Sequence, residues 1–227
     1  MLQAYKNSKL LVELNEDVKT SSIIGELTHL QADLFWYLLR SATAYNESLP
    51  EIAGEIYTVE YWPKWSAEGC DITNNQFVEP DVFIRFQKFD IILEIKKNDG
   101  CGQYMTQWTN EICGYLNEYA DDNKDIYIIA LGGNNNMQKE NIRKLRDNDL
   151  VVHKCSWFSL LEKVNEQMRS LYRLPYKDSC TMQTIRILQD IVSSFNLYGD
   201  YVMEGFDNFP KNLLLCNNYK IDDIWNI

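Results

Sequence analysis

The sequence predicts an α/β fold in which a mixed sheet is flanked by helices and followed by a helical extension. Segments with the spacing of amphipathic helices alternate with β-prone segments along the chain. Two β-prone runs, 82–86 and 91–95, are separated by a short connection that is typical of an antiparallel hairpin. The nearly continuous apolar run at 125–131 is typical of a strand that is buried on both faces.

The first half of the chain is expected to form one helix and three strands. Thr20, Ser21 and Ser22 offer N-cap side chains, and apolar residues then recur at helical spacing up to about residue 42. The segment 55–61 alternates as a strand does. The two runs of the hairpin supply the other strands.

The second half is expected to alternate helices and strands. In order, its elements are a helix at 102–119, a strand at 125–131, a polar helix at 137–148, a strand at 150–155, helices at 156–172 and 181–198, and a less regular tail to residue 227. Gly132 and Gly133 are interpreted as a turn that ends the strand. They lack both the Lys-Ser/Thr of a phosphate loop and the glycine spacing of a dinucleotide-binding motif.

Composition excludes several classes of protein. Of the 227 residues, 45% are hydrophobic and 24% are charged, which excludes a mostly disordered chain. No run of about 18 apolar residues occurs, so no membrane-spanning helix and no membrane partner are expected. The first residues lack the basic-then-apolar order of a secretory signal, and we expect a cytoplasmic location.

The six cysteines stand apart, without a Cys-x-x-Cys pair. Cys113 and Cys155 fall in segments that are expected to be core. We therefore expect free, buried thiols in a reducing compartment rather than disulfides. A zinc site is not expected, because closely spaced thiolate or imidazole ligands are missing.

Net charge is the unusual property of this chain. Lys and Arg number 22 against 33 Asp and Glu, which gives −11. A protein that neutralises many phosphates unaided is usually basic. If this chain acts on nucleic acid, we expect weak, salt-sensitive binding that is assisted by a second copy or by a partner subunit.

The residues that point to chemistry lie at the ends of the hairpin strands. Glu94 and Lys96 are two residues apart and project from the same face, while Ile95 points into the core. Asp81 lies at the start of the preceding strand. A turn near 87–88 sets it opposite the end of the next strand. Two carboxylates and an ammonium are therefore expected to converge at one edge of the sheet.

This grouping suits a magnesium site. The carboxylates of Asp81 and Glu94, with the backbone carbonyl of Ile95, are the hard oxygen ligands that Mg²⁺ prefers. The metal lowers the pKa of a bound water, and Lys96 is placed to orient that water. Glu26 flanks the apolar stripe of the first helix, from which a carboxylate can reach inward as a further ligand.

Two glutamines follow the motif. Gln103 and Gln107 are one helical turn apart and share a face, so their amides can contact phosphate or sugar without competing for the metal. Tyr104, Trp108 and Tyr115 have the spacing of core residues rather than of base-stacking platforms.

With Glu26, Pro80-Asp81, Glu94-Ile95-Lys96, Gln103 and Gln107 in this order, the sequence resembles the PD-(D/E)XK nuclease superfamily. The resemblance covers residues 20–160, in which Asp81, Glu94 and Lys96 match most firmly. It implies a restriction-endonuclease-like αβββαβ core within a nuclease-like domain at 1–175, followed by a helical extension at 176–227 that packs on the core or forms an interface.

The resemblance also implies a metal-dependent nuclease that hydrolyses phosphodiester bonds of DNA, in anti-phage defence or a mobile element. Asp81 and Glu94 would bind Mg²⁺, for which Mn²⁺ can substitute, and Lys96 would act on the attacking water. Glu26 would match the first-helix glutamate of many members. Gln103 and Gln107 would match the polar residue on the following helix.

The residues leave alternatives open. Lys96 also fits a solvated strand end that balances Glu94, and Glu26 fits an exposed helix ion pair. A basic group on the predicted polar helix either forms a solvated face or contacts phosphates; it consists of Lys139, Arg143, Lys144 and Arg146. The alternative function is a catalytically silent interaction protein on the same fold, either an acidic subunit or a DNA mimic.

Overall fold

The computed structural model describes residues 15–72, 77–145 and 148–202. Helices α2 (Glu16–Leu27) and α3 (Ala32–Ala42) precede strands β1 (Ile56–Tyr61), β2 (Trp65–Ser66), β3 (Phe77–Val78), β4 (Val82–Phe86) and β5 (Phe89–Ile95). Then come α4 (Met105–Tyr119), β6 (Asp125–Leu131), β7 (Glu140–Leu145), β8 (Asn148–Cys155), α5 (Trp157–Tyr172) and α6 (Ser179–Leu197).

A six-stranded mixed sheet forms the centre of the fold, in the order β1–β4–β5–β6–β8–β7. Strands β5, β6 and β8 are parallel, whereas β4 pairs antiparallel with both β1 and β5, and β7 pairs antiparallel with β8. Strands β2 and β3 form a separate antiparallel pair. The predicted α/β class, with a mixed sheet flanked by helices, is confirmed.

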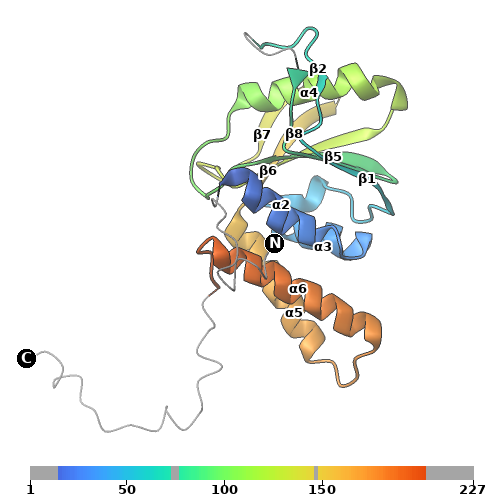
Figure 1. Ribbon diagram of the computed structural model, residues 1–227. Coiled ribbons are helices and arrows are strands. Elements are labelled where there is room, and N and C mark those ends of the chain that lie inside the picture. The colour runs from blue at the N-terminus through green and yellow to red at the C-terminus, as the bar shows by residue number, and fades with distance from the viewer. Residues whose placement is uncertain (1–14, 73–76, 146–147, 203–227) are drawn as a thin grey trace, which may run out of the picture.

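Helices cover both faces of the sheet (Figure 1). Helix α4 and the β2–β3 pair lie over one face, and α2, α3, α5 and α6 lie over the other. Strand β5 is buried along its whole length, as a strand between two layers must be. Its alternation directs Ile91, Leu93 and Ile95 to the larger helical layer and Ile92 to the α4 layer.

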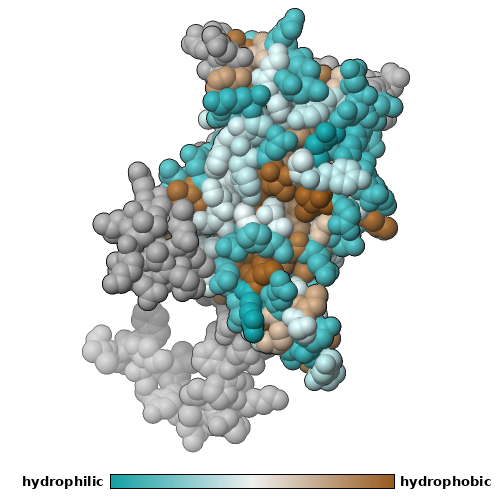
Figure 2. Space-filling view, turned by 45° about the vertical axis from the view of Figure 1, so that its right-hand side comes forward, coloured by the Kyte–Doolittle hydropathy of each residue, from teal (hydrophilic) through white to brown (hydrophobic). Residues whose placement is uncertain are grey.

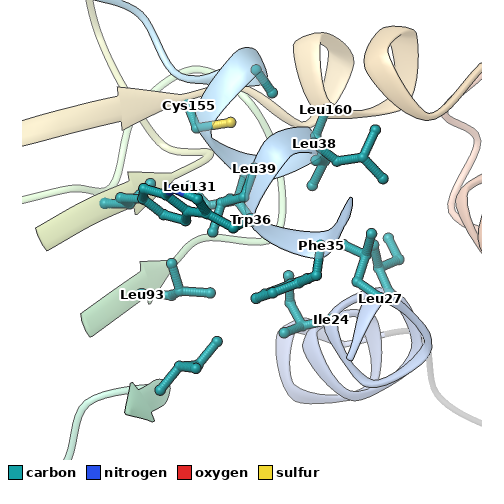
Figure 3. Packing of buried hydrophobic residues seen from close by; sticks show 14 of the residues in the cluster. Ile24, Leu27, Phe35, Trp36, Leu38, Leu39, Leu93, Leu131, Cys155 and Leu160 are labelled. Carbon is teal, nitrogen blue, oxygen red and sulfur yellow. The ribbon is translucent and has the colours of Figure 1, made fainter. Parts of the chain in front are cut away.

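The larger core lies between the sheet and helices α2, α3, α5 and α6. Phe35 and Trp36 of α3 extend toward Leu93 and Leu131 of the sheet, and Ile24 of α2 lies beside Phe35 (Figure 3). Helix α6 contributes buried residues to the same cluster, namely Leu188, Ile191 and Phe195. Helix α6 thus packs on the core.

The first helical segment is divided, so the expected single helix from about 20 to 42 is wrong. Thr28 ends α2: its backbone N–H donates to Ile24 O, and its hydroxyl donates to Gly25 O at 2.7 Å. Gln31 is extended (φ −57°, ψ 142°) and is the N-cap residue of the separate helix α3. The expected N-caps were also placed too late, because Asn15 caps α2 by accepting from Val18 N at 2.9 Å.

The expected polar helix at 137–148 is also wrong. This segment contains β7, which pairs with the first part of β8. Pairing with a neighbouring strand outweighs a local helical preference, and charged side chains are common on an edge strand such as β7. Arg143 and Lys144 therefore lie on a strand, and Arg146 lies outside the described residues.

Two expectations about cysteine have different outcomes. Cys155 is buried and free, as expected. Cys113 is half-buried and forms a disulfide with Cys70, so the expectation that all cysteines are free is wrong. The disulfide joins α4 to the loop after β2. The two cysteines are 43 positions apart in the sequence, so their pairing could not be predicted from local pattern and depends on the fold.

No helix within the described ranges is long and apolar enough to cross a membrane. On the face drawn in Figure 2, apolar side chains form small groups among hydrophilic ones.

Candidate functional site

The hairpin register sets Asp81 opposite Glu94. Val82 pairs with Leu93 across β4 and β5, so the residue before Val82 faces the residue after Leu93. Asp81 Oδ2 accepts a hydrogen bond from Ile95 N at 2.7 Å, which holds the aspartate against the end of β5. The sequence-based expectation about this register is confirmed.

Lys96 points to the same place. Its Nζ donates to Glu94 Oε1 and, at 3.1 Å, to Ile95 O. The backbone of Lys96 is held on both sides, because its N–H donates to Leu131 O at 2.9 Å and its carbonyl accepts from Trp157 Nε1 at 2.7 Å. The structure therefore brings Asp81, Glu94 and Lys96 together on a rigid strand end.

The two glutamines differ in position. Gln107 Nε2 donates to Glu94 Oε1 at 2.6 Å, so Gln107 contacts the site directly. The amide of buried Gln103 donates to Glu94 O at 3.0 Å and to Gly132 O at 3.2 Å, and accepts from Trp108 Nε1 at 2.9 Å. Those bonds occupy the Gln103 amide, which joins β5, β6 and α4 rather than facing a substrate.

Helix α4 adds a carboxylate that sequence reasoning missed. Glu111 lies one turn after Gln107 and is 1% exposed. Neither of its carboxylate oxygens has a hydrogen-bond partner among the described residues, and the same is true of Glu94 Oε2. A signal was present in the sequence: Glu111 lies on the apolar stripe of α4, between buried Trp108 and Tyr115.

Burial and mutual repulsion shift the pKa values of these groups. Burial, then the charge of Glu94, raises the pKa of Asp81 to about 8. Burial and the neighbouring Glu94 raise the pKa of Glu111 well above its ordinary value. Burial lowers the pKa of Lys96, but the charge of Glu94 and its hydrogen bond outweigh this effect, so the pKa is raised. The site therefore holds three carboxyl groups, from Asp81, Glu94 and Glu111, beside the single ammonium of Lys96.

The first helix contributes Glu16 to this region. Glu16 Oε2 accepts from Lys97 N at 2.7 Å, and Oε1 lies 3.9 Å from Lys96 Nζ. Glu26, the predicted first-helix carboxylate, lies about 15 Å farther along the α2 axis. Its Oε2 is 3.6 Å from Nδ1 of exposed His29, as in the alternative of a helix ion pair. Sequence reasoning missed Glu16 because the helix was expected to begin after it.

A groove of about 670 Å³ runs beside α4; among the described residues its lining includes Gln107, which bonds to Glu94, but not Asp81, Glu94 or Lys96. Gln107 and Glu111 line it on one side and Glu79 on the other. Tyr104 stands at the groove and is 67% exposed, so its expected core position is wrong, whereas Trp108 and Tyr115 are buried as expected. Within the described part of the chain, the charged side chains that line this groove are carboxylates.

No protein-family model matches this chain. The chain is 29% identical over 133 residues to "Uncharacterized protein PM0110" of Pasteurella multocida (strain Pm70). The matched region covers 58% of this chain and 47% of that protein, so the chain spans about half the length of the relative.

The oxygen atoms around Glu94 can bind positive charge. No group of three or more His, Cys, Asp or Glu side chains, within residues 15–72, 77–145 and 148–202, has the geometry to hold a metal ion as it stands. The Lys96 ammonium bonds to Glu94 Oε1 and Ile95 O, both of which are predicted metal ligands. The site therefore already holds the positive charge of Lys96, and Glu94 Oε2 has no hydrogen-bond donor among the described residues.

Proposed function

We propose that this protein is a divalent-cation-dependent nuclease of the PD-(D/E)XK type that hydrolyses phosphodiester bonds of DNA. The observation that carries the proposal is the convergence of Asp81, Glu94 and Lys96 at adjacent strand ends. The order of α2, β1, β4, β5, α4 and β6 is compatible with the αβββαβ core of that superfamily.

The residues present fit a divalent cation. Asp81, Glu94 and the carbonyl of Ile95 are hard oxygen donors, and buried Glu94 Oε2 has no donor among the described residues. These three residues would hold Mg²⁺ or Mn²⁺. When bound, the ion would lower the pKa of a water and stabilise charge on the phosphate.

The protein's own groups have separate roles in this proposal. Lys96 has three donors on a flexible stem, so it can orient the attacking water while its backbone stays fixed. Gln107 holds Glu94 by a hydrogen bond from the α4 side. Glu16 holds the strand end through Lys97 N and adds negative charge near Lys96.

The acidity of the chain bears on how DNA is held. A net charge of −11 and the carboxylates of the groove repel phosphates. We therefore propose that a second copy of the chain, or a partner subunit with a basic surface, supplies most of the phosphate contacts.

Cleavage assays with matched lysine variants test the proposal. Purified protein is incubated with Mg²⁺ or Mn²⁺ and with single-stranded, duplex and supercoiled DNA. We expect Lys96→Met to lower the cleavage rate by about 100-fold or more, because the water loses its orienting group. Lys97→Met is the control, since the adjacent Lys97 side chain is exposed.

The outcomes separate the proposal from its alternative. Cleavage by the wild type that is lost in both Lys96→Met and Asp81→Asn supports a nuclease. Intact DNA under all conditions, together with partner binding that neither substitution changes, would instead indicate the acidic interaction protein.

A further inference from the structure

The end of the hairpin formed by α5 and α6 differs in charge from the rest of the chain. Residues 167–189 contain one acidic residue, Asp178, and four basic ones, which are Arg169, Arg173, Lys177 and Arg186. This segment therefore carries a charge of about +3 in a chain of net charge −11. The Asp178 carboxylate is used to cap α6, because it accepts from Thr181 N at 2.7 Å. Positive charge is thus concentrated at the end of the hairpin.

These four cations are not neutralised within the described structure. The three arginines are exposed, and Lys177 is half-buried. None of the four forms a salt bridge with a described carboxylate. The Lys177 ammonium donates to Leu174 O at 2.8 Å instead. By contrast, Lys163 lies earlier on α5 and pairs with Glu166 at 2.8 Å. The positive charge at the end of the hairpin is therefore open to an anion.

Two exposed tyrosines lie among these cations. Tyr172 is 45% exposed and Tyr176 is 81% exposed. Tyr172 follows Arg169 by one turn of α5, so the two side chains share a face. The hydroxyl of Tyr172 accepts a hydrogen bond from Gln189 Nε2 of α6 at 2.7 Å, and Arg186 lies one turn before Gln189. This bond joins the basic faces of the two helices into one surface.

Helix α5 connects this surface to the candidate site. Trp157 is the first residue of α5, and its indole N–H donates to Lys96 O at 2.7 Å. From there the 16 residues of α5 extend for about 24 Å to Tyr172. The end of the hairpin is directed away from the sheet (Figure 1). A nucleic-acid strand that contacts both places would span about seven nucleotides, at about 3.4 Å each.

We propose that the end of the α5–α6 hairpin binds a single-stranded segment of DNA. The cations contact phosphates, and the two tyrosine rings stack on bases, whose faces are open in a single strand and covered in a duplex. An anionic membrane fits less well, because it binds a helix with a free apolar face, and the apolar faces of α5 and α6 are buried in the core. Continuation of the bound strand to Lys96 rests on the proposed function, whereas the binding does not.

Binding in EDTA tests this proposal without a metal ion or a reaction. Fluorescence anisotropy measures the affinity of the full chain for a labelled single strand of about 20 nucleotides over a range of salt concentrations. Arg169→Gln/Arg173→Gln is expected to weaken binding about 10-fold or more and to reduce the salt slope by about 1.4, because two phosphate contacts are lost. Lys88→Gln/Lys163→Gln removes the same charge elsewhere and is the matched control, because Lys88 lies in the exposed β4–β5 turn and Lys163 pairs with Glu166.

A tyrosine variant separates stacking from charge. Tyr176→Ala is expected to weaken single-strand binding about 5-fold or more and to leave binding of a duplex of the same sequence unchanged. Tyr57→Ala, at a tyrosine of β1 that is 63% exposed, is the control. Circular dichroism checks that each variant folds.

Three results would overturn the proposal. The first is an unchanged affinity and salt slope in folded Arg169→Gln/Arg173→Gln. The second is an equal loss of single-strand and duplex binding in Tyr176→Ala. The third is binding of the wild type to phosphatidylserine vesicles, lost in the arginine variant, with no binding to DNA.

The same variants distinguish this proposal from the nuclease proposal. Single-strand binding that depends on the arginines, in a protein that cuts no nucleic acid with Mg²⁺ or Mn²⁺, supports the DNA-binding surface and counts against the nuclease. Cleavage of DNA by a protein whose affinity for single strands does not depend on the end of the hairpin supports the nuclease and overturns the DNA-binding surface.

Discussion

Gln107 Nε2 donates a hydrogen bond to Glu94 Oε1 at 2.6 Å, and Lys96 Nζ donates to the same oxygen. One carboxylate oxygen of β5 thus fixes both an amide of helix α4 and the ammonium at the strand end. Because Glu94 is fully buried, these bonds lie in a low-dielectric environment in which each donor matters. Helix α4 therefore helps to set the position of Lys96.

Replacing Gln107 by Leu is expected to lower DNA cleavage about 10-fold or more, because a hydrogen bond to a charged acceptor is worth about 1.5–3 kcal/mol. The measurement is the cleavage rate with Mg²⁺. Thr109→Ala is the control on the same helix, since its hydroxyl bonds only to Met105 O in the described structure. An unchanged rate in Gln107→Leu would show that the contact does not support the site.

The turn after β6 is expected to tolerate no side chain. A Cβ at Gly132 would lie 2.5 Å from Lys96 O and 2.8 Å from Trp157 Nε1, and the residue has φ +71°. Gly69 has the same φ, but a Cβ there meets no described atom within 4 Å. Gly69→Ala is therefore expected to cost about 1 kcal/mol of unfolding free energy, from backbone strain alone.

Gly132→Ala is expected to cost about 3 kcal/mol or more and to slow cleavage, because the clash also displaces Lys96. Urea denaturation of the two variants measures the difference. If Gly69→Ala and Gly132→Ala lose the same unfolding free energy, the short distance between Gly132 and Lys96 O does not matter for stability.

The disulfide is expected to contribute to stability. Cys70 and Cys113 close a loop across 43 positions, and their replacement by Ser is expected to lower the unfolding free energy by about 2–4 kcal/mol. Melting temperatures with and without a dithiol reductant provide the measurement. Cys101→Ser, at an exposed free cysteine, is the control. A wild type whose melting temperature does not respond to the reductant would argue against this contribution.

His153 is expected to make stability depend on pH. Burial, then the charge of Lys139, lowers the pKa of His153 from its ordinary 6.5 to about 4. Between pH 6.5 and about pH 4, His153 is protonated in the unfolded chain but neutral in the folded chain. The contribution of His153 to stability is therefore complete above pH 6.5 and is lost as the pH falls toward 4, by about 3 kcal/mol in all.

Comparison of the wild type with His153→Gln measures this effect. Urea denaturation at pH 7 and pH 5 is expected to show a loss in the wild type that exceeds the loss in the variant by about 2 kcal/mol. Asp81 and Glu111, whose raised pKa values act in the opposite direction, are present in both proteins and cancel. His29→Gln, at an exposed histidine, should behave as the wild type does. Parallel losses in wild type and His153→Gln would refute the role of His153.

Much of the site followed from local rules. The alternation of a strand sets Glu94 and Lys96 on one face, and a short hairpin fixes the register that brings Asp81 opposite them. Glu16 and Glu111 did not follow, for different reasons. The start of α2 depends on the Asn15 cap, and the role of Glu111 depends on which face of α4 meets β5.

The sequence by itself determined the α/β class, the buried central strands, the hairpin and the meeting of Asp81, Glu94 and Lys96. These features depend on periodicity within a few residues, which local stereochemistry controls. Only the tertiary structure decided that α2 and α3 are separate helices, that the segment containing Glu140–Leu145 is a strand, and that Cys70 joins Cys113. It also decided that Glu111 of α4 is buried near enough to Glu94 for the charge of Glu94 to raise the pKa of Glu111. The disulfide and the position of Glu111 depend on partners distant in the sequence. The break after α2 and the pairing of β7 with β8 involve nearer residues, but in both cases packing or strand pairing outweighs the local helical preference.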